Sequence, residues 1–170
     1  MMIQPRVTSL EPIPSDDVAA QVLRTPAPLP VPRPTWCKRC QLFMPVNDQS
    51  DIAWSIRCDG EDDRQHLDVH LTPRRLPPMS NSEEILTLSW PARLRTVLDR
   101  GVTSTPPDSS RRHKADEPPL YVLHMYIEEM TLALQAVGVS RDEMLSIATT
   151  VRLIGQDELV EWLRCQPVIS

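Results

Sequence analysis

The distribution of prolines limits most strongly what this chain can fold into. The sequence holds 18 prolines among 170 residues, and eight of them lie in residues 1–34. Every second residue from position 26 to position 34 is a proline. Because proline has a fixed φ and no backbone N–H, such a run cannot join a helix and favours an extended polyproline II path. We therefore predict a disordered, proline-rich leader at residues 1–34.

A second stretch rich in loop-forming residues divides the rest of the chain. Residues 102–118 combine proline, serine and threonine with a short basic cluster, a composition that predicts a linker. The leader and the linker leave two ordered units, a small β-rich module with one helix at residues 35–101 and a helical unit at residues 119–166. The fold class predicted from these units is α+β.

Two segments of the middle module alternate between apolar and polar residues, as half-buried strands do. One face of residues 51–58 and one face of residues 65–71 are apolar, made respectively by Ile52, Trp54, Ile56 and Cys58 and by Leu67, Val69 and Leu71. The polar residues 59–64 between them predict the loop of a β-hairpin. We expect a short strand at residues 85–88 after the hairpin, and then a helix with Ser89 as N-cap that ends near Gly101.

The C-terminal unit has apolar residues at spacings of three and four, as an amphipathic helix requires, at Leu120, Leu123, Ile127, Met130, Leu134 and Val137. Gly138 is expected to end that helix. Ser140 and Glu143 form a capping-box pattern that predicts a second helix running to about Ile154. Asp157 is expected to cap a short third helix. These patterns together predict a C-terminal three-helix unit.

Cysteines and histidines of the middle module have the residue types of a zinc site. Cys37 and Cys40 form a C-x2-C pair, Cys58 ends the first strand of the predicted hairpin, and His66 begins the second. Zinc prefers four sulfur or nitrogen ligands in a tetrahedron. We predict a structural, zinc-ribbon-like site at Cys37, Cys40, Cys58 and His66, with His70 as the alternative fourth ligand. The competing interpretation is that the cysteines are metal-free thiols beside a hairpin.

Charge and hydropathy narrow the setting in which the protein is expected to act. The formal net charge is −5 and the sequence pI is near 5.3, which argues against binding nucleic acid or anionic membranes by charge alone. The sequence has no stretch of 18 apolar residues and no signal-peptide pattern, so we expect a cytoplasmic protein without a membrane partner. In a reducing cytosol the cysteines are expected to be thiols or metal ligands. Cys165, near the end of the third predicted helix, is expected to be an inert thiol.

The motifs favour a protein that works by binding. The sequence has no phosphate-binding glycine loop, nucleophile elbow or H-E-x-x-H pattern, so we lean against an enzyme and leave open one whose site has no recognisable motif. The leading hypothesis is an interaction or regulatory protein whose C-terminal helices dock on a protein partner or on a second copy.

The alternative hypothesis is a DNA-binding transcriptional regulator. Residues 133–147 have the apolar spacing of a helix-turn-helix with Gly138 in the turn, and residues 137–141 are similar to the turn of bacterial DNA-binding repressors. Asp142 and Glu143 would begin the recognition helix, and their negative charge disfavours contact with phosphates.

Overall fold

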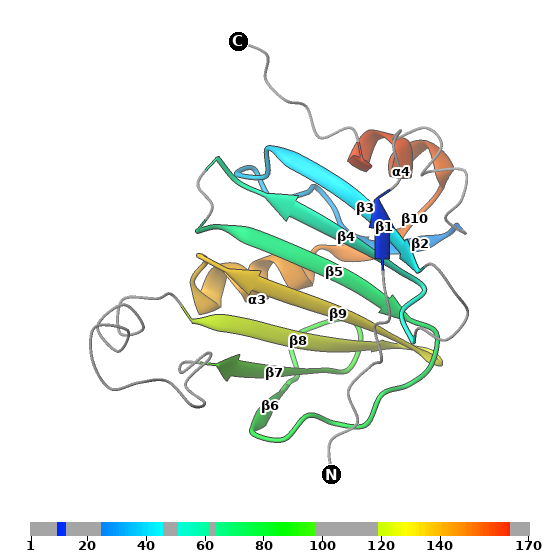
Figure 1. Ribbon diagram of the computed structural model, residues 1–170. Coiled ribbons are helices and arrows are strands. Elements are labelled where there is room, and N and C mark those ends of the chain that lie inside the picture. Colours follow the sequence, from blue (N-terminus) through cyan, green and yellow to red (C-terminus); the bar gives the residue numbers. More distant parts are fainter. Residues whose placement is uncertain (1–9, 13–24, 46–50, 62–63, 98–118, 164–170) are drawn as a thin grey trace.

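An eight-stranded antiparallel sheet dominates the fold, as Figure 1 shows. The computed structural model describes residues 10–12, 25–45, 51–61, 64–97 and 119–163. In spatial order the sheet consists of β1 (Leu10–Pro12), β3 (Arg39–Pro45), β4 (Trp54–Asp59), β5 (His66–Thr72), β9 (Met130–Val137), β8 (Leu120–Ile127), β7 (Ala92–Val97) and β6 (Ser82–Ile85). A second, two-stranded sheet pairs β2 (Ala27–Pro30) with β10 (Val151–Ile154). The described helices are α3 (Arg141–Thr149) and α4 (Gln156–Leu163).

Two antiparallel meanders build the large sheet. The first runs through β3, β4 and β5, and the second runs inward from the opposite edge through β6, β7, β8 and β9. They join at the centre of the sheet, where β5 pairs with β9 from His66 opposite Val137 to Thr72 opposite Thr131. The pairing of β5 with β9 therefore joins the two meanders into one continuous sheet.

A second layer, made of α3, the β2–β10 ribbon and α4, covers one face of the sheet (Figure 1). The core lies between the two layers and includes Leu67 and Leu134 from the sheet, Met144 from α3 and Leu159 from α4, all fully buried. A hydrogen bond from a tryptophan indole also links each helix to the segment between residues 30 and 36. Trp36 Nε1 donates to the Glu143 carboxylate over 2.8 Å, and Trp162 Nε1 donates to the carbonyl of Pro30.

The predicted hairpin is confirmed. β4 pairs with β5, with Trp54 opposite Leu71, Ile56 opposite Val69 and Cys58 opposite Leu67. These six side chains are buried on the face that the second layer covers. The Ser140 cap is also confirmed, since its hydroxyl accepts the Glu143 N–H over 3.0 Å. The Glu143 carboxylate binds Trp36 across the layers, so the capping pattern also serves a tertiary contact.

The predicted C-terminal three-helix unit is wrong. Residues 120–137 form the hairpin β8–β9, which turns at two residues, with Glu128 at a φ of 56°. Most residues of both strands are buried, on both faces of the sheet, and nearly every position is apolar. In such a sequence apolar residues also occur three and four positions apart, so the spacing does not distinguish a helix from a strand. The turn carries no Gly or Asn, the residues that usually mark a tight hairpin. The segment at 133–147 is therefore strand, turn and helix rather than a helix-turn-helix.

Two further predictions in this region are corrected. The second predicted helix ends at Thr149, and residues 151–154 form β10. Gly138 does not end a helix but follows β9, where its φ is 81° and a Cβ would lie 2.3 Å from the Arg64 carbonyl oxygen. The third helix is present as α4 and begins at Gln156.

The helix expected after Ser89 is also wrong, because residues 92–97 form β7 between β6 and β8. Ala92 and Leu94 are buried while Arg93 lies on the other face, where its guanidinium donates to the hydroxyl and carbonyl oxygens of Ser82, both over 2.8 Å. Alternate burial identifies a strand, but Ala92, Leu94 and Val97 are also compatible with a helical stripe. The preceding strand is β6, earlier than the predicted residues 85–88.

The predicted disordered leader is corrected in its last ten residues. Ala27–Pro30 form β2, and all four residues are buried. The prolines stand at every second position, and in a two-stranded ribbon only alternate N–H groups face the partner strand. Val31 N–H donates to the Thr150 carbonyl over 3.1 Å, which places the prolines 28 and 30 at the outward positions. The rest of the leader, apart from β1, and the predicted linker 102–118 lie outside the described residues.

Candidate metal centre

Three of the four predicted ligands lie together at one end of the β3–β4 ladder. Cys40 stands directly opposite Cys58 in the register, and their Sγ atoms are 3.6 Å apart. The Sγ atoms of Cys37 and Cys40 are 3.5 Å apart, and all three lie within 4.8 Å of one another. Among the described residues, this is the group of side chains that could hold a metal ion.

Backbone hydrogen bonds position the pair Cys37 and Cys40. The Cys37 N–H donates to the Pro34 carbonyl over 3.0 Å, which closes a turn just before β3. The next N–H, of Lys38, donates to the Asp59 carbonyl at the end of β4 over 2.8 Å. The turn is therefore fixed to the strand that carries Cys58, so the three thiols are brought together by backbone pairing.

The sulfur separations match those of a metal–thiolate site. A tetrahedron with zinc–sulfur bonds of about 2.3 Å places its sulfur atoms roughly 3.8 Å apart. The observed separations of 3.5 and 3.6 Å are close to that value. Cys37 and Cys58 are buried and Cys40 is half-buried, as expected for a structural site closed to water.

The structure does not bring His66 to the cysteines. Cys58 pairs with Leu67, so these two share the core-facing side of the sheet. Successive side chains of a strand point to opposite faces, which places His66, Asp68 and His70 on the other side. His66 Nε2 lies 4.0 Å from the Asp68 carboxylate there. His66 and its alternative His70 therefore belong to a different surface from the three thiols.

That opposite side, the histidine face, consists of His66, Asp68 and His70 on β5 and His124 and Tyr126 on β8. His70 and His124 both stand opposite Ala133 of β9, so they occupy one row across three strands. Burial lowers the pKa of His70. Burial and, to a smaller extent, the neighbouring His70 together lower the pKa of His124 to about 4. Burial raises the pKa of Asp68, an effect that the neighbouring histidines reduce.

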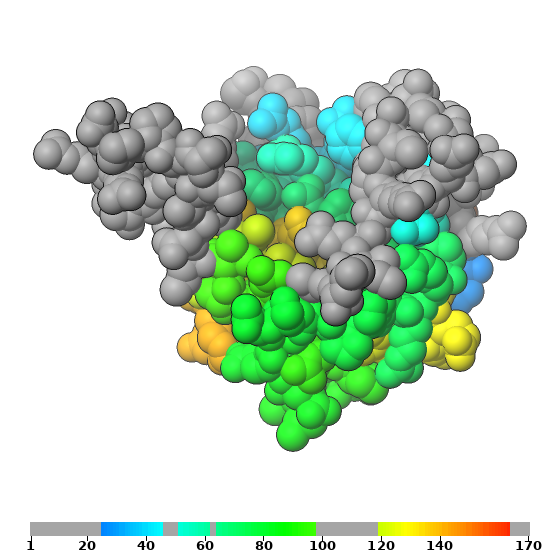
Figure 2. Space-filling model, turned by 60° about the horizontal axis from the view of Figure 1, so that its bottom comes forward, coloured from blue at the N-terminus to red at the C-terminus, as the bar shows by residue number. Residues whose placement is uncertain are grey.

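Part of the histidine face is covered by residues 73–81. Leu76 N–H donates to the Thr131 hydroxyl over 2.9 Å, and the Arg75 guanidinium lies 4.7 Å from the centre of the Tyr126 ring. In Figure 2 the green segments, which include residues 73–97, lie at the front of the view. Among the described residues, the Nδ1 atoms of the three histidines are buried without a hydrogen-bond partner. Burial disfavours the charged form of an imidazole, in line with the lowered pKa values of His70 and His124.

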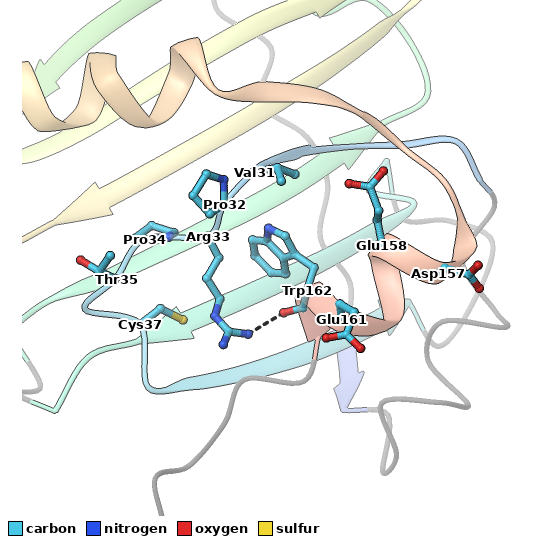
Figure 3. A pocket seen from close by; sticks show the side chains of 10 residues that line it. All are labelled: Val31, Pro32, Arg33, Pro34, Thr35, Cys37, Asp157, Glu158, Glu161 and Trp162. Carbon is cyan, nitrogen blue, oxygen red and sulfur yellow. Dashed lines mark hydrogen bonds between the residues drawn. The ribbon is translucent and has the colours of Figure 1, made fainter.

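A pocket of about 530 Å³ adjoins Cys37. Its walls are residues 31–35 and Cys37 on one side and Asp157, Glu158, Glu161 and Trp162 of α4 on the other (Figure 3). Arg33 crosses it and donates to the Trp162 carbonyl over 2.8 Å. The sequence prediction missed this pocket because it assigned residues 31–34 to a disordered leader.

Comparisons of the chain with protein-family models, with curated proteins and with solved structures found no match. Neither α3 nor α4 has the length and apolar character that crossing a lipid bilayer requires.

Proposed function

We propose that this protein is a non-enzymatic interaction module whose fold is held by a structural zinc ion at Cys37, Cys40 and Cys58. The observation that supports this proposal is the convergence of three Sγ atoms within 4.8 Å. Thiolates are soft ligands that favour zinc over magnesium or calcium. A reducing, cytoplasmic setting belongs to the proposal, because it would keep the thiols available for the metal.

The position of the cysteines indicates what the metal would stabilise. Cys40 and Cys58 belong to adjacent strands of the large sheet, whereas Cys37 follows the segment that leads from β2 to β3. A zinc ion there would tie the second layer to the sheet. Its binding free energy would then contribute to the free energy of folding.

The partner of this module is proposed to be a protein rather than DNA. The helix pair that a DNA reader would need at residues 133–147 is replaced by β9 and α3. Residues 119–163 carry two arginines against seven acidic residues, a formal charge of −5. Because affinity for DNA depends on neutralising phosphates, this charge disfavours a duplex as partner. We expect no duplex to shift in a low-salt gel; a shift that weakens as salt rises would contradict this part.

Metal analysis tests the zinc site directly. The full chain is purified under reducing conditions and its metal content is measured by elemental mass spectrometry, beside Cys58→Ser and His66→Asn variants. We expect about one zinc per wild-type chain, a large loss in Cys58→Ser, and no loss in His66→Asn because that side chain lies on the opposite face. A wild type that is folded by circular dichroism and contains no metal would overturn the proposal.

A further inference from the structure

The pocket beside α4 has the size and the walls of a ligand-binding site. Its volume of about 530 Å³ falls within the range of sites that bury a drug-sized ligand, roughly 300–1,000 Å³. Val31, Pro32, Pro34 and Trp162 supply apolar surface, and Thr35 adds a hydroxyl. The pocket is therefore large enough for a short peptide segment and apolar enough to bury an aliphatic or aromatic side chain.

Hydrogen bonds of the second layer hold both walls of the pocket in place. The Val31 N–H donates to the Thr150 carbonyl over 3.1 Å, which fixes the start of one wall to the end of α3. On the other wall, the Trp162 indole is buried and donates to the carbonyl of Pro30. Because the walls are held in this way, a ligand would lose little free energy in ordering them.

Arg33 supplies a positive charge to the pocket. Its side chain crosses the pocket, and its guanidinium donates to the Trp162 carbonyl over 2.8 Å (Figure 3). A guanidinium has five N–H donors, and among the described residues no carboxylate pairs with this one. Arginine binds a carboxylate through two parallel hydrogen bonds, and apolar surroundings strengthen such a pair. The pocket therefore favours a ligand that ends in a carboxylate.

The wall formed by α4 is acidic. Asp157, Glu158 and Glu161 line the pocket and are exposed to solvent, and Glu158 also accepts from the Arg152 guanidinium. These carboxylates disfavour a phosphate group, which carries nearly two negative charges at neutral pH. They favour a ligand that has positive charge a short distance from its own carboxylate. A polypeptide that ends in an apolar residue after basic residues has these features.

From these contacts we propose that the pocket binds the C-terminus of a partner polypeptide. The terminal carboxylate pairs with Arg33, the last side chain is apolar and packs against Trp162, and the basic residues before it lie beside the acidic wall. Recognition of a terminal carboxylate is a recurring mode of peptide binding. The inference rests on the proposed protein partner, whose chemistry it names, and its contacts require no metal ion.

Fluorescence polarisation of synthetic peptides with the full chain tests the inference. The probes are N-terminally labelled Lys-Lys-Ser-X peptides with a free carboxylate, in which X is Leu, Val or Phe, and the controls are the same peptides with a C-terminal amide. We expect the free carboxylate to bind at least about tenfold more tightly, because the amide loses the charge-assisted bonds to Arg33. Equal binding of acid and amide, or no saturable binding up to about 1 mM peptide, would overturn the inference.

Arg33→Gln removes the cation, and Arg95→Gln is the matched control, since Arg95 of β7 does not line the pocket. We expect Arg33→Gln to weaken binding of the free-carboxylate peptides about tenfold or more, to leave the amides nearly unchanged and to retain zinc. The Arg95→Gln variant is expected to bind like the wild type. Wild-type peptide binding by Arg33→Gln would overturn the inference, whereas the proposed zinc site is judged separately from the metal content of the same samples.

Photo-crosslinking of the wild type gives a readout that does not depend on how a variant folds. A probe with p-benzoylphenylalanine as its last residue is expected to label residues 31–35 or α4, as located by peptide mass spectrometry. Labelling that is confined to other parts of the chain would also overturn the inference.

Discussion

The two faces of the large sheet carry metal-binding residue types in opposite arrangements. On the core side, Cys40 and Cys58 face each other across one pair of strands and Cys37 joins them from the preceding turn. On the histidine face, His70 and His124 are separated by a whole strand, with Ala133 between them. The cysteines therefore converge on a point, whereas the histidines are spread along a row.

The difference shows that the pleat of a strand decides which candidate ligands meet. Cys58 and His66 are close in sequence and belong to adjacent strands, yet Cys58 pairs with Leu67 and His66 pairs with Asp59. A shift of one residue moves a side chain to the other face. Residue type and spacing identified the cysteines, but they could not assign the histidines to a side.

The largest effect on stability is expected from removing the metal, which acts on the cysteine side of the sheet and not on the histidine face. Structural zinc contributes about 10–16 kcal/mol of apparent binding free energy in zinc-finger peptides. We expect a chelator to lower the free energy of unfolding of the wild type by on the order of 5 kcal/mol or more, measured by urea titration. The Cys58→Ser variant serves as control and should not respond to chelator. An identical wild-type midpoint with and without chelator would contradict the prediction.

Lowering the pH is expected to reduce the free energy of unfolding through the buried histidines of the histidine face. The folded-state pKa of His124 is about 4, below its ordinary value of 6.5, because the ring is buried. The unfolded chain therefore binds a proton more readily, so stability is full above pH 6.5 and falls as the pH decreases toward 4. At 1.36 kcal/mol per pKa unit, His124 alone accounts for roughly 3 kcal/mol. The lowered pKa of His70 acts in the same direction, and the raised pKa of Asp68 acts in the opposite one.

The measurement is the difference in unfolding free energy between the wild type and a His124→Gln variant from pH 7.5 to pH 4.5. Acid also releases metal from thiolates, and this effect is common to both chains and cancels in the difference. We expect the variant to gain stability relative to the wild type as the pH falls. A difference that stays constant over this range would mean that the ring is not held neutral.

A smaller effect is expected from Trp36→Phe, which removes the hydrogen bond between the indole and the Glu143 carboxylate while retaining an aromatic side chain. A bond to a charged acceptor of this kind contributes about 1.5–3 kcal/mol, and solvent at this half-buried contact reduces the expected loss to about 1 kcal/mol. Thermal unfolding of the zinc-loaded protein measures it. Zinc content should be unchanged, and loss of zinc would mean that Trp36 positions Cys37.

The smallest effect is predicted for the variant His70→Asn, whose zinc affinity should remain close to that of the wild type. His70 lies on the histidine face, so the zinc affinity measured by chelator competition should stay within about twofold of the wild type, well below the 10–100-fold cost of disturbing even an outer-shell partner. A large loss would show that the histidine face contributes to the metal site and would erase the distinction between the two faces.

Local sequence patterns predicted those parts of the fold in which one side of an element is polar. The hairpin β4–β5 alternates because His66, Asp68 and His70 are less buried than the apolar residues between them. The Ser140 cap was recognisable because it depends on residues three positions apart. The pair Cys37 and Cys40 was recognisable for the same reason, and β3 and β4 then brought Cys58 to it.

Only the tertiary structure decided the identity of β8 and β9, the pairing of β2 and the face on which each candidate ligand lies. In β8 and β9 both faces are largely buried, so the hydrophobic period that separates a strand from a helix is absent from the sequence. The prolines of β2 are tolerated because β2 pairs with β10 on one side only, and the prolines stand at the positions whose N–H would point away from β10. The sequence alone determined which residue types could bind a metal and which turns and caps form locally. Which of those residues meet depends on strand register and pleat, and these are set by partners distant in the chain.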